Sequence, residues 1–387
     1  MTWSSRGTCF WTLVLACACI SCSNGTVVQL DSVSRLLYVA GSTIRAIDLD
    51  SGGTPWVIPL DGTVEGVVVG AKPHHLFVTV KGSNFQRELV RVDLCTRRVD
   101  RRLAMSGIAG PDQANGIRLA TGEVMAVHPL ADRLYLWRSW REDTLGIASV
   151  DLGEFAPTAF SGPLNVVAGG IKLFWPGRTN ETLGVIASRD QNARQSGTKV
   201  YLLDPHSLNV RDSIDSSDLG QQGQIWDLNM LGDGRTILVG GAGWLVTYDT
   251  DLRQPVRSVA RPVSGVARVS PDQSTVVLTD SGVWPDFPGS GLLHLFDAQL
   301  SPIGTVDVST PLGGLPGSPT ATVTRTVAFA DDGRTAYVAS GTLEFGPLYA
   351  TQTVRIIAVD LQTRTVLRVY ELGGHEMGWP FLSPSCE

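Results

Sequence analysis

The chain has little of what catalysis, metal binding and nucleic-acid binding usually need. Its 387 residues include only six cysteines and six histidines, and charged residues make up 18% of the chain. The net charge of −6 and the pI near 5.6 argue against nucleic-acid binding, and there is no basic stripe interleaved with aromatics. No G-x-S-x-G elbow, Walker loop or Rossmann fingerprint is present. We therefore expect no resident cofactor, no metal and no nucleic-acid partner.

After residue 25 the chain also lacks a sustained 3.6-residue periodicity, so no substantial helix is expected. What recurs instead is a short apolar run that ends in aspartate, as in "IRAIDLD" and "IIAVDLQ". Seven copies occur, 45 to 63 residues apart, and their closing residues are Asp48, Asp93, Asp151, Asp204, Asp249, Asp297 and Asp360. Each carboxylate is expected to accept hydrogen bonds from backbone N–H groups two residues on, which fixes the turn into the next strand.

Each copy belongs to a unit of four short apolar runs. A run such as "RLLYVAG" or "TAYVAS" precedes the aspartate run, with turn sequences such as "GDGR" or "DDGR" before it, and further runs flank this pair. Runs rich in Val, Ile, Leu, Thr and Tyr between turn residues are typical of an antiparallel meander. Seven such sheets predict an all-β fold, a single seven-bladed β-propeller of four-stranded antiparallel blades. We expect the propeller over residues 23–372 and a C-terminal tail over 373–387.

The first 22 residues differ from the rest. "MTWSSRGTCFWTLVLACACISCSNG" has one positive residue, Arg6, and then an apolar stretch that is too short to span a bilayer, which is typical of a signal peptide. Its end resembles a bacterial lipoprotein signal, in which a small residue precedes a lipidated cysteine. Cys22 is preferred to Cys17 because polar residues follow it. The resemblance implies an exported outer-membrane lipoprotein of the bacterial cell envelope, facing periplasm or surface and touching the membrane only through its lipid. A secreted protein and an uncleaved anchor remain alternatives.

Only Cys95 and Cys386 lie outside the signal. Exported proteins seldom keep two reduced thiols, so a bridge between them is one expectation, and two reduced cysteines are the alternative. The tail of about 14 residues after Leu372 could span roughly 45 Å if it is extended, which would reach the second blade.

The repeats resemble the YVTN-type β-propeller repeat in "SPDQSTVVLTD", "DDGRTAYVAS", "RLLYVAG" and "VRIIAVDLQTRTVLRV". The resemblance covers residues from about 26 to 372. It implies the propeller fold but not a function, because relatives include partner-binding surface proteins, phosphogluconolactonase-like enzymes and quinoprotein-like dehydrogenases.

The loops of such a meander divide unequally between the two faces of the ring. Turns such as "DDGR" and "DLQTR" on one face are short, whereas extra length gathers on the other face at 104–116, 189–197, 281–291, 309–322 and 340–352. Longer loops on one rim of a rigid scaffold are the usual place for binding. Aromatics and arginines suited to a protein or sugar surface fall there, namely Trp140, Arg141, Arg189, Arg194, Trp284, Phe287, Phe345 and Tyr349. Alternatively, these side chains fold over one another and plug the channel mouth.

We therefore expect a monomeric, non-enzymatic binding scaffold that recognises a protein or glycan through its long-loop face. The alternative is a lactonase-like hydrolase or a quinoprotein-like dehydrogenase that uses the channel mouth. The lactonase-like enzyme would need two or more acid–base residues at the channel mouth, and the candidates near inner strands are Glu65, His128, Arg118, Asp227 and Arg325. The dehydrogenase would need cationic and stacking residues around one cavity with calcium ligands, and no such set can be assembled from the sequence.

Overall fold

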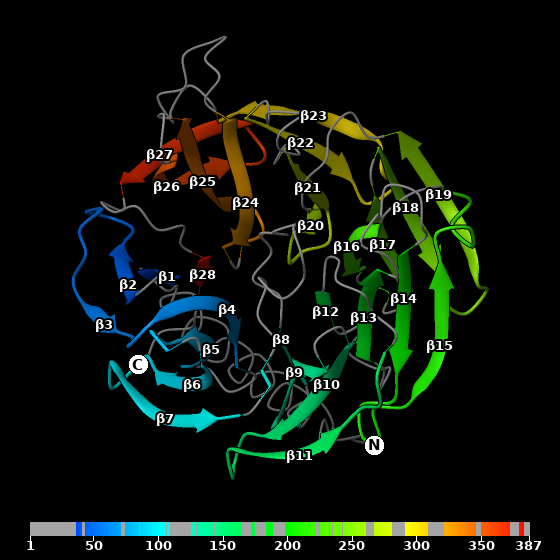
Figure 1. Ribbon diagram of the computed structural model, residues 1–387. Helices are drawn as coiled ribbons and strands as arrows, with labels where there is room; N and C mark the ends of the chain where they lie inside the picture. Colours follow the sequence, from blue (N-terminus) through cyan, green and yellow to red (C-terminus); the bar gives the residue numbers. More distant parts are fainter. Residues whose placement is uncertain are drawn as a thin grey trace, which may run out of the picture.

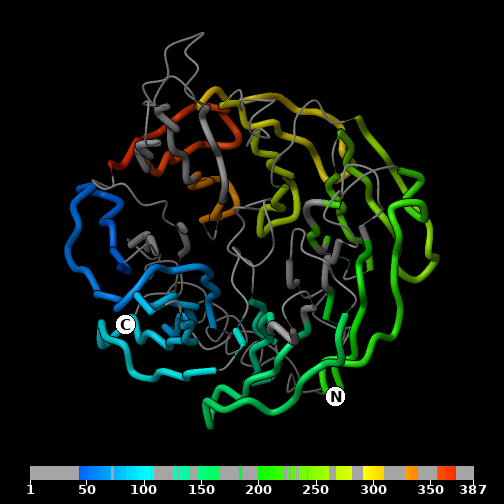
Figure 2. The backbone as a smooth tube through the Cα atoms, viewed as in Figure 1, coloured from blue at the N-terminus to red at the C-terminus, as the bar shows by residue number. Residues whose placement is uncertain are grey.

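The computed structural model describes residues 36–40, 43–70, 74–84, 86–105, 107–108, 125–128, 131–141, 144–164, 172–174, 183–188, 198–221, 225–231, 233, 235–241, 243–260, 267–280, 291–308, 321–330, 332–345, 350–371 and 379–382. Within these ranges the regular elements are strands, and no helix could cross a membrane. The strands form seven four-stranded antiparallel sheets, which stand as blades in a ring (Figures 1 and 2). The seven-bladed propeller expected from the repeats is therefore confirmed.

We number the blades 1 to 7 around the ring and their strands first to fourth from the axis outward. The first strands are β28 (Trp379–Leu382), β4 (Thr63–Val69), β8 (Met125–Val127), β12 (Lys172–Phe174), β16 (Ile225–Met230), β20 (Ala267–Val269) and β24 (Ala321–Phe329). The second strands are β1 (Leu36–Ala40), β5 (His75–Lys81), β9 (Arg133–Arg141), β13 (Leu183–Ser188), β17 (Thr236–Gly241), β21 (Thr275–Thr279) and β25 (Thr335–Phe345). The third strands are β2 (Thr43–Asp48), β6 (Arg87–Asp93), β10 (Thr144–Asp151), β14 (Thr198–Leu203), β18 (Trp244–Asp249), β22 (Leu292–Asp297) and β26 (Ala350–Asp360). The fourth strands are β3 (Val57–Pro59), β7 (Arg98–Ala104), β11 (Ala156–Phe160), β15 (Val210–Asp215), β19 (Gln254–Ala260), β23 (Pro302–Asp307) and β27 (Thr365–Glu371).

Blade 1 takes its innermost strand from the other end of the chain. β28 pairs antiparallel with β1, with Trp379 opposite Ala40 and Leu382 opposite Leu37. Residues 379–382, which the sequence analysis placed in a tail after the propeller, thus belong to the ring. The last strand completes the first sheet, so the ring is closed by backbone hydrogen bonds between the two ends of the chain.

The middle strands of each blade are buried on both faces because each blade is sandwiched between two others. All six residues of β18 are buried, and β17 is buried from Ile237 to Gly241. Fourth strands line the outside and are largely exposed, as in β7 and β19. This burial explains why the second and third runs are almost continuously apolar in the sequence, whereas fourth runs such as β7 and β19 contain polar and charged residues.

Seven hydrophobic clusters fill the seams between adjacent blades, one cluster to each seam. Alternate residues of one strand serve opposite seams: Ile237 and Val239 pack toward blade 4, whereas Leu238 packs toward blade 6. The seventh cluster joins Ile47 of blade 1 to Tyr337 and Ile356 of blade 7. Ring closure therefore has an apolar component as well as the β28 strand.

The seven aspartates at the ends of the third strands each accept backbone hydrogen bonds. In blade 7, Asp360 Oδ1 accepts the N–H groups of Gln362 at 2.9 Å and Thr363 at 2.8 Å. Equivalent bonds reach Asp48, Asp93, Asp151, Asp204, Asp249 and Asp297. These bonds hold the backbone of the turn into the outer strand.

A residue with positive φ follows each aspartate and lies at the seam with the preceding blade. It lies four positions after the aspartate in six blades and three positions after it in blade 6: Gly52, Arg97, Phe155, Leu208, Arg253, Leu300 and Arg364. Phe155 stacks on Phe77 of blade 2 with ring centroids 6.5 Å apart, and Arg253 pairs with Asp212 of blade 4 at 2.9 Å. The left-handed backbone of the turn thus aims one side chain at the neighbouring blade, and the resulting contact offsets the local strain.

Candidate binding face

The two rims of the ring differ in how they are built. The first–second turn and the third–fourth turn of a blade lie together on one rim, which we call the turn face. In blade 7, Arg334 in the first turn donates to Asp360 in the second at 2.6 and 2.8 Å, and Leu361 N–H donates to Arg334 O at 2.9 Å. Equivalent backbone bonds join Leu94 to His74 and Thr250 to Arg235. The opposite rim, which we call the loop face, carries the second–third connections and the blade-to-blade connections.

Electrostatics on the turn face favour ionised carboxylates. The hydrogen bond from Arg334 lowers the pKa of Asp360 from 3.8 to about 2, and that from Arg235 does the same for the pKa of Asp249. For Asp204 the backbone N–H of Ser207 is the main cause of a pKa of about 2. These carboxylates are occupied by turn amides and arginines, so this rim is built for stability.

On the loop face, blade 7 is taller than the other blades. β25 and β26 have 11 residues each, whereas the other second and third strands have five to nine. Beyond the pair Ser340–Arg355, where β27 stops pairing, five further residue pairs continue to Phe345 opposite Ala350. At about 3.3 Å per residue this ribbon rises about 16 Å beyond the end of β27, and β24 stays paired with it as far as Leu343. Residues 340–352 had been expected to form a loop, and most of them instead form strand.

The candidate binding residues fall into two groups. Trp140 and Arg141 end β9, and Phe345 ends β25, so the backbone places all three at the loop-face ends of second strands. The other five lie outside the described residues: Arg189, Arg194, Trp284, Phe287 and Tyr349. Cys22 and Cys386 also lie outside them. The backbone thus places three of the eight predicted binding residues on the loop face, and the positions of the other five stay a prediction.

Three inner strands carry a β-bulge at the same height. The extra residues are Glu65 in β4, Trp226 in β16 and Arg325 in β24. In each case the bulge falls opposite the fifth and sixth residues of the second strand. A bulge leaves one residue unpaired and redirects its side chain, and bulges are over-represented next to functional sites. Asp227, a further candidate from the sequence, directly follows one of these bulges.

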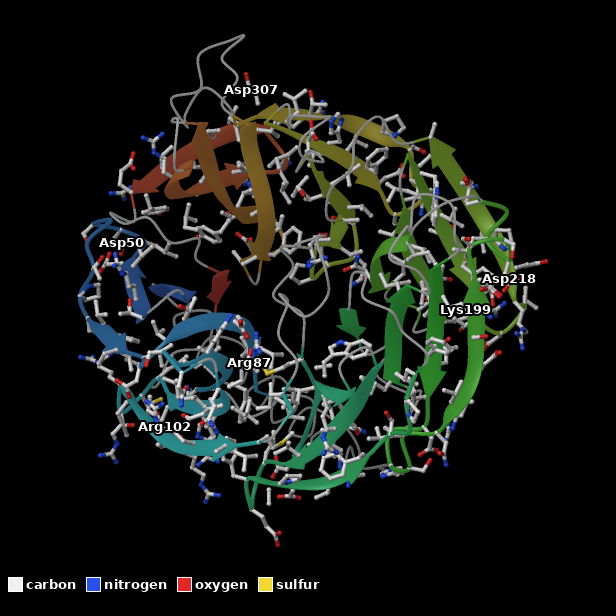
Figure 3. The ribbon with its side chains drawn as sticks, viewed as in Figure 1. Asp50, Arg87, Arg102, Lys199, Asp218 and Asp307 are labelled. Atoms are coloured by element: carbon white, nitrogen blue, oxygen red, sulfur yellow. The ribbon has the colours of Figure 1, made fainter. Side chains whose placement is uncertain are left out.

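The bulged Glu65 forms a buried ion pair with Arg87, the first residue of β6. Arg87 Nε lies 2.5 Å from Oε2, and Nη2 lies 3.0 Å from Oε1, so the contact is bidentate. The side chain of Arg87 is 7% exposed and that of Glu65 is 8% exposed. Figure 3 shows Arg87 on the inner side of blade 2, whereas Arg102 lies on the outer rim. The pair fixes the loop-face end of blade 2, and sequence reasoning missed Arg87 because 22 residues separate it from Glu65.

Of the remaining acid–base candidates, His128 has a structural role in a turn and Arg118 lies outside the described residues. His128 is buried, and its Nδ1 accepts the N–H of Ala131 at 3.1 Å within the β8–β9 turn. Among the residues that the structure describes, no three His, Cys, Asp or Glu side chains are grouped to hold a metal ion.

One polar contact joins two inner strands. Asn229 of β16 donates its Nδ2 to the carbonyl of Ala267 in β20 at 2.8 Å, and Arg268 donates to the same oxygen at 2.7 Å. This contact bridges blades 5 and 6 close to the axis. It therefore links the inner strands of two adjacent blades by a polar interaction as well as by the apolar seam.

These features define the class of protein, which is a β-propeller with one plain rim and one elaborated rim. No protein-family model matches the sequence, and no curated protein is similar to it. Among solved structures, that of dihydro-heme d1 dehydrogenase NirN in complex with DHE is similar with a TM-score of 0.54 and 12% identity. The match covers 89% of this chain and 74% of that one. At this identity the likeness shows the propeller fold alone.

Proposed function

We propose that this chain is an exported, lipid-anchored β-propeller of the bacterial cell envelope that binds a protein or glycan partner through its loop face. The observation that carries the proposal is the asymmetry of the ring. On the turn face, the aspartate carboxylates are held by turn amides and, in blades 4, 5 and 7, also by an arginine, whereas on the loop face the β25–β26 ribbon continues beyond the end of β27. This extended element with Phe345 at the end of β25, together with Trp140 and Arg141 at the end of β9, supports partner binding on this face.

The YVTN-type repeat and the lipoprotein-like signal ending at Cys22 support the same proposal. A monomeric propeller that is tethered through a lipid at its N-terminus can hold a binding surface at some distance from the membrane. In the described part of the chain, Glu65 is bound by Arg87 and His128 by its own turn. The observations therefore favour the scaffold over a lactonase-like or quinoprotein-like enzyme.

Shortening the ribbon tests the proposal. Residues 343–352 are replaced by Asn-Gly, so that Thr342 and Thr353, which already pair, flank a two-residue turn. A photo-cross-linking amino acid at Phe345, compared with one at the exposed Arg98 on the outer strand β7, captures the partner in the producing cell, and a glycan array screens the purified protein. We expect cross-links from position 345 but not from position 98, and we expect glycan binding, or capture through a cross-linker at Arg141, which the shortened variant keeps, to vanish when the ribbon is shortened. Equal capture from both positions, or binding that survives shortening, would contradict the proposal.

The lipid anchor has a separate test. Metabolic labelling with an alkyne fatty acid is expected to label the wild type and Cys17→Ser but not Cys22→Ser. Labelling of Cys22→Ser together with loss of label in Cys17→Ser would move the anchor to Cys17, and no label in any form would remove the lipoprotein assignment.

A further inference from the structure

The way in which β28 is inserted determines where the C-terminus leaves the ring. β28 runs antiparallel to β1, and its last residue, Leu382, pairs with Leu37. Leu36, next to Leu37, pairs with Asp48, the aspartate of the blade 1 turn. The chain therefore emerges from β28 on the turn face, next to the axis, with residues 383–387 still to follow.

Cys95 lies on the same face in the neighbouring blade. It follows Asp93 in the turn between β6 and β7, and its N–H donates to Asp93 Oδ1 at 2.8 Å. The residue is exposed, and its sulfur is disulfide-bonded. The other five cysteines of the chain lie outside the described residues, so the partner sulfur belongs to one of Cys9, Cys17, Cys19, Cys22 and Cys386.

Distance and chain order select Cys386. It is four residues past Leu382, a span of about 13 Å when extended, and a disulfide adds about 5.5 Å between the two Cα atoms. From the inner strand of one blade to the third–fourth turn of the next is about 12 Å across the sheet and, at right angles to this, about 10 Å between the packed sheets, which together make ~16 Å. The four N-terminal cysteines all lie within the segment that the proposed signal cleavage and lipidation would remove or modify.

We infer that a Cys95–Cys386 disulfide clasps the closed ring, by tying the end of the chain to blade 2 just after β28 has completed blade 1. In its formation the two thiols lose two protons and pass two electrons to the disulfide of a thiol–disulfide oxidoreductase, through a mixed disulfide with that enzyme. The oxidoreductase leaves as a dithiol, and one new S–S bond remains in the propeller. Such a bond persists in an oxidising compartment.

The clasp acts on β28 in particular. Without it, β28 is tethered on one side only, through residues 372–378 that follow β27, so it can detach from β1 and swing away, which exposes the edge of blade 1. With it, β28 is tethered on both sides, so a detached strand stays close to its site, its effective concentration rises and it rebinds faster. Opening of blade 1 is therefore suppressed without any change in the contacts of the closed state.

Two measurements on the full-length protein test the clasp. Tryptic digestion without reduction is expected to yield the peptide VDLCTR, residues 92–97, linked to the C-terminal peptide, residues 369–387. Alkylation of both thiols, or linkage of Cys95 to an N-terminal cysteine or to a second chain, would overturn the pairing.

Amide hydrogen exchange then measures whether the disulfide slows the opening of blade 1. Exchange at residues 37–40 of β1 is expected to speed up at least tenfold in Cys386→Ser, and also in wild type that is reduced and alkylated after folding, whereas the neighbouring control Ser385→Ala exchanges like wild type. The reduced and alkylated sample serves as the test should Cys386→Ser fail to fold. Unchanged exchange in that sample would overturn the clasp. Both measurements need neither partner nor membrane, so failure of the proposed binding function would leave them unaffected.

Discussion

The guanidinium of Arg368 lies directly over Gly52 across the seam between blades 7 and 1. A Cβ at position 52 would be 2.9 Å from Arg368 Nη2, and Gly52 has a φ of +76°. Arg368 donates hydrogen bonds to the carbonyls of Leu49, Asp50 and Ser51 in the same turn. In other blades the equivalent residue reaches back to its neighbour, as Phe155 does, whereas here the glycine leaves room for the neighbour to reach forward.

We therefore expect Gly52→Ala to weaken this seam. The new methyl group must displace a guanidinium that three carbonyls hold, and it strains a left-handed backbone, so the free energy of unfolding should fall by about 1–2 kcal/mol. Urea unfolding measures the loss. In an Arg368→Ala background the same change should cost less, because only the backbone strain remains. Equal costs in both backgrounds would show that the two residues are not coupled.

The aspartates of the turn face should make the fold sensitive to acid. The pKa values of Asp204, Asp249 and Asp360 are about 2 in the folded protein, against an ordinary value of 3.8. Their stabilisation is therefore complete above about pH 4–5 and is lost as the pH falls from about 4 to 2, because the unfolded chain binds the protons first. Thermal unfolding across this range should show a falling Tm. The fall should be shallower in Asp360→Asn, which keeps an acceptor for the turn amides but does not titrate; an identical slope would contradict the assignment.

The contribution of the positive-φ residue to stability should differ between blades, because this residue contacts different groups in each. Leu300 is fully buried in the seam between blades 5 and 6, so Leu300→Gly relieves strain but empties a packed site, with an expected net loss of about 2–4 kcal/mol. Arg253→Gly relieves the same strain and loses an exposed ion pair with Asp212 and a hydrogen bond with Tyr248, so its stability should fall by no more than about 1 kcal/mol. Denaturant midpoints of the two variants test this contrast. A large loss in Arg253→Gly would mean that the surface pair contributes more than its exposure implies.

Removing only one partner of the buried Glu65–Arg87 ion pair should lower the free energy of unfolding more than removing both. Arg87→Met leaves a buried carboxylate without its cation and should lower the free energy of unfolding by about 3–5 kcal/mol. The double variant Glu65→Gln with Arg87→Met removes both charges and should recover much of that loss. Calorimetric unfolding of the single and double variants gives the coupling. A double variant no better than Arg87→Met would show that the bidentate geometry itself, rather than charge burial, is what the blade needs.

Sequence reasoning recovered the blades because their signal is local. Each unit carries an apolar second and third strand and an aspartate that caps the following turn, as Asp360 does with Gln362 and Thr363. Those patterns need only a dozen neighbouring residues to be visible. The division into a plain rim and an elaborated rim followed from loop lengths alone.

What could not be read from the sequence depends on partners that are distant in the chain. Residues 379–382 have no local hairpin, and only the closed ring brings β1 beside them. The ribbon beyond Ser340 contains glycine and polar residues that are typical of loops, and its strand character comes from cross-strand pairing with β26. The bulge at Glu65 and its contact with Arg87 likewise depend on backbone register, which composition does not encode.

The insertion of β28 into blade 1 also dictates an order of assembly. Blades 2 to 7 can pack against one another as soon as each has been made, but blade 1 must wait with an incomplete inner edge until residues 379–382 have left the ribosome. A fusion that holds residues 379–382 near another domain would prolong that wait, and the unfinished first blade would then be the place where a nascent chain is captured by chaperones or by a second copy.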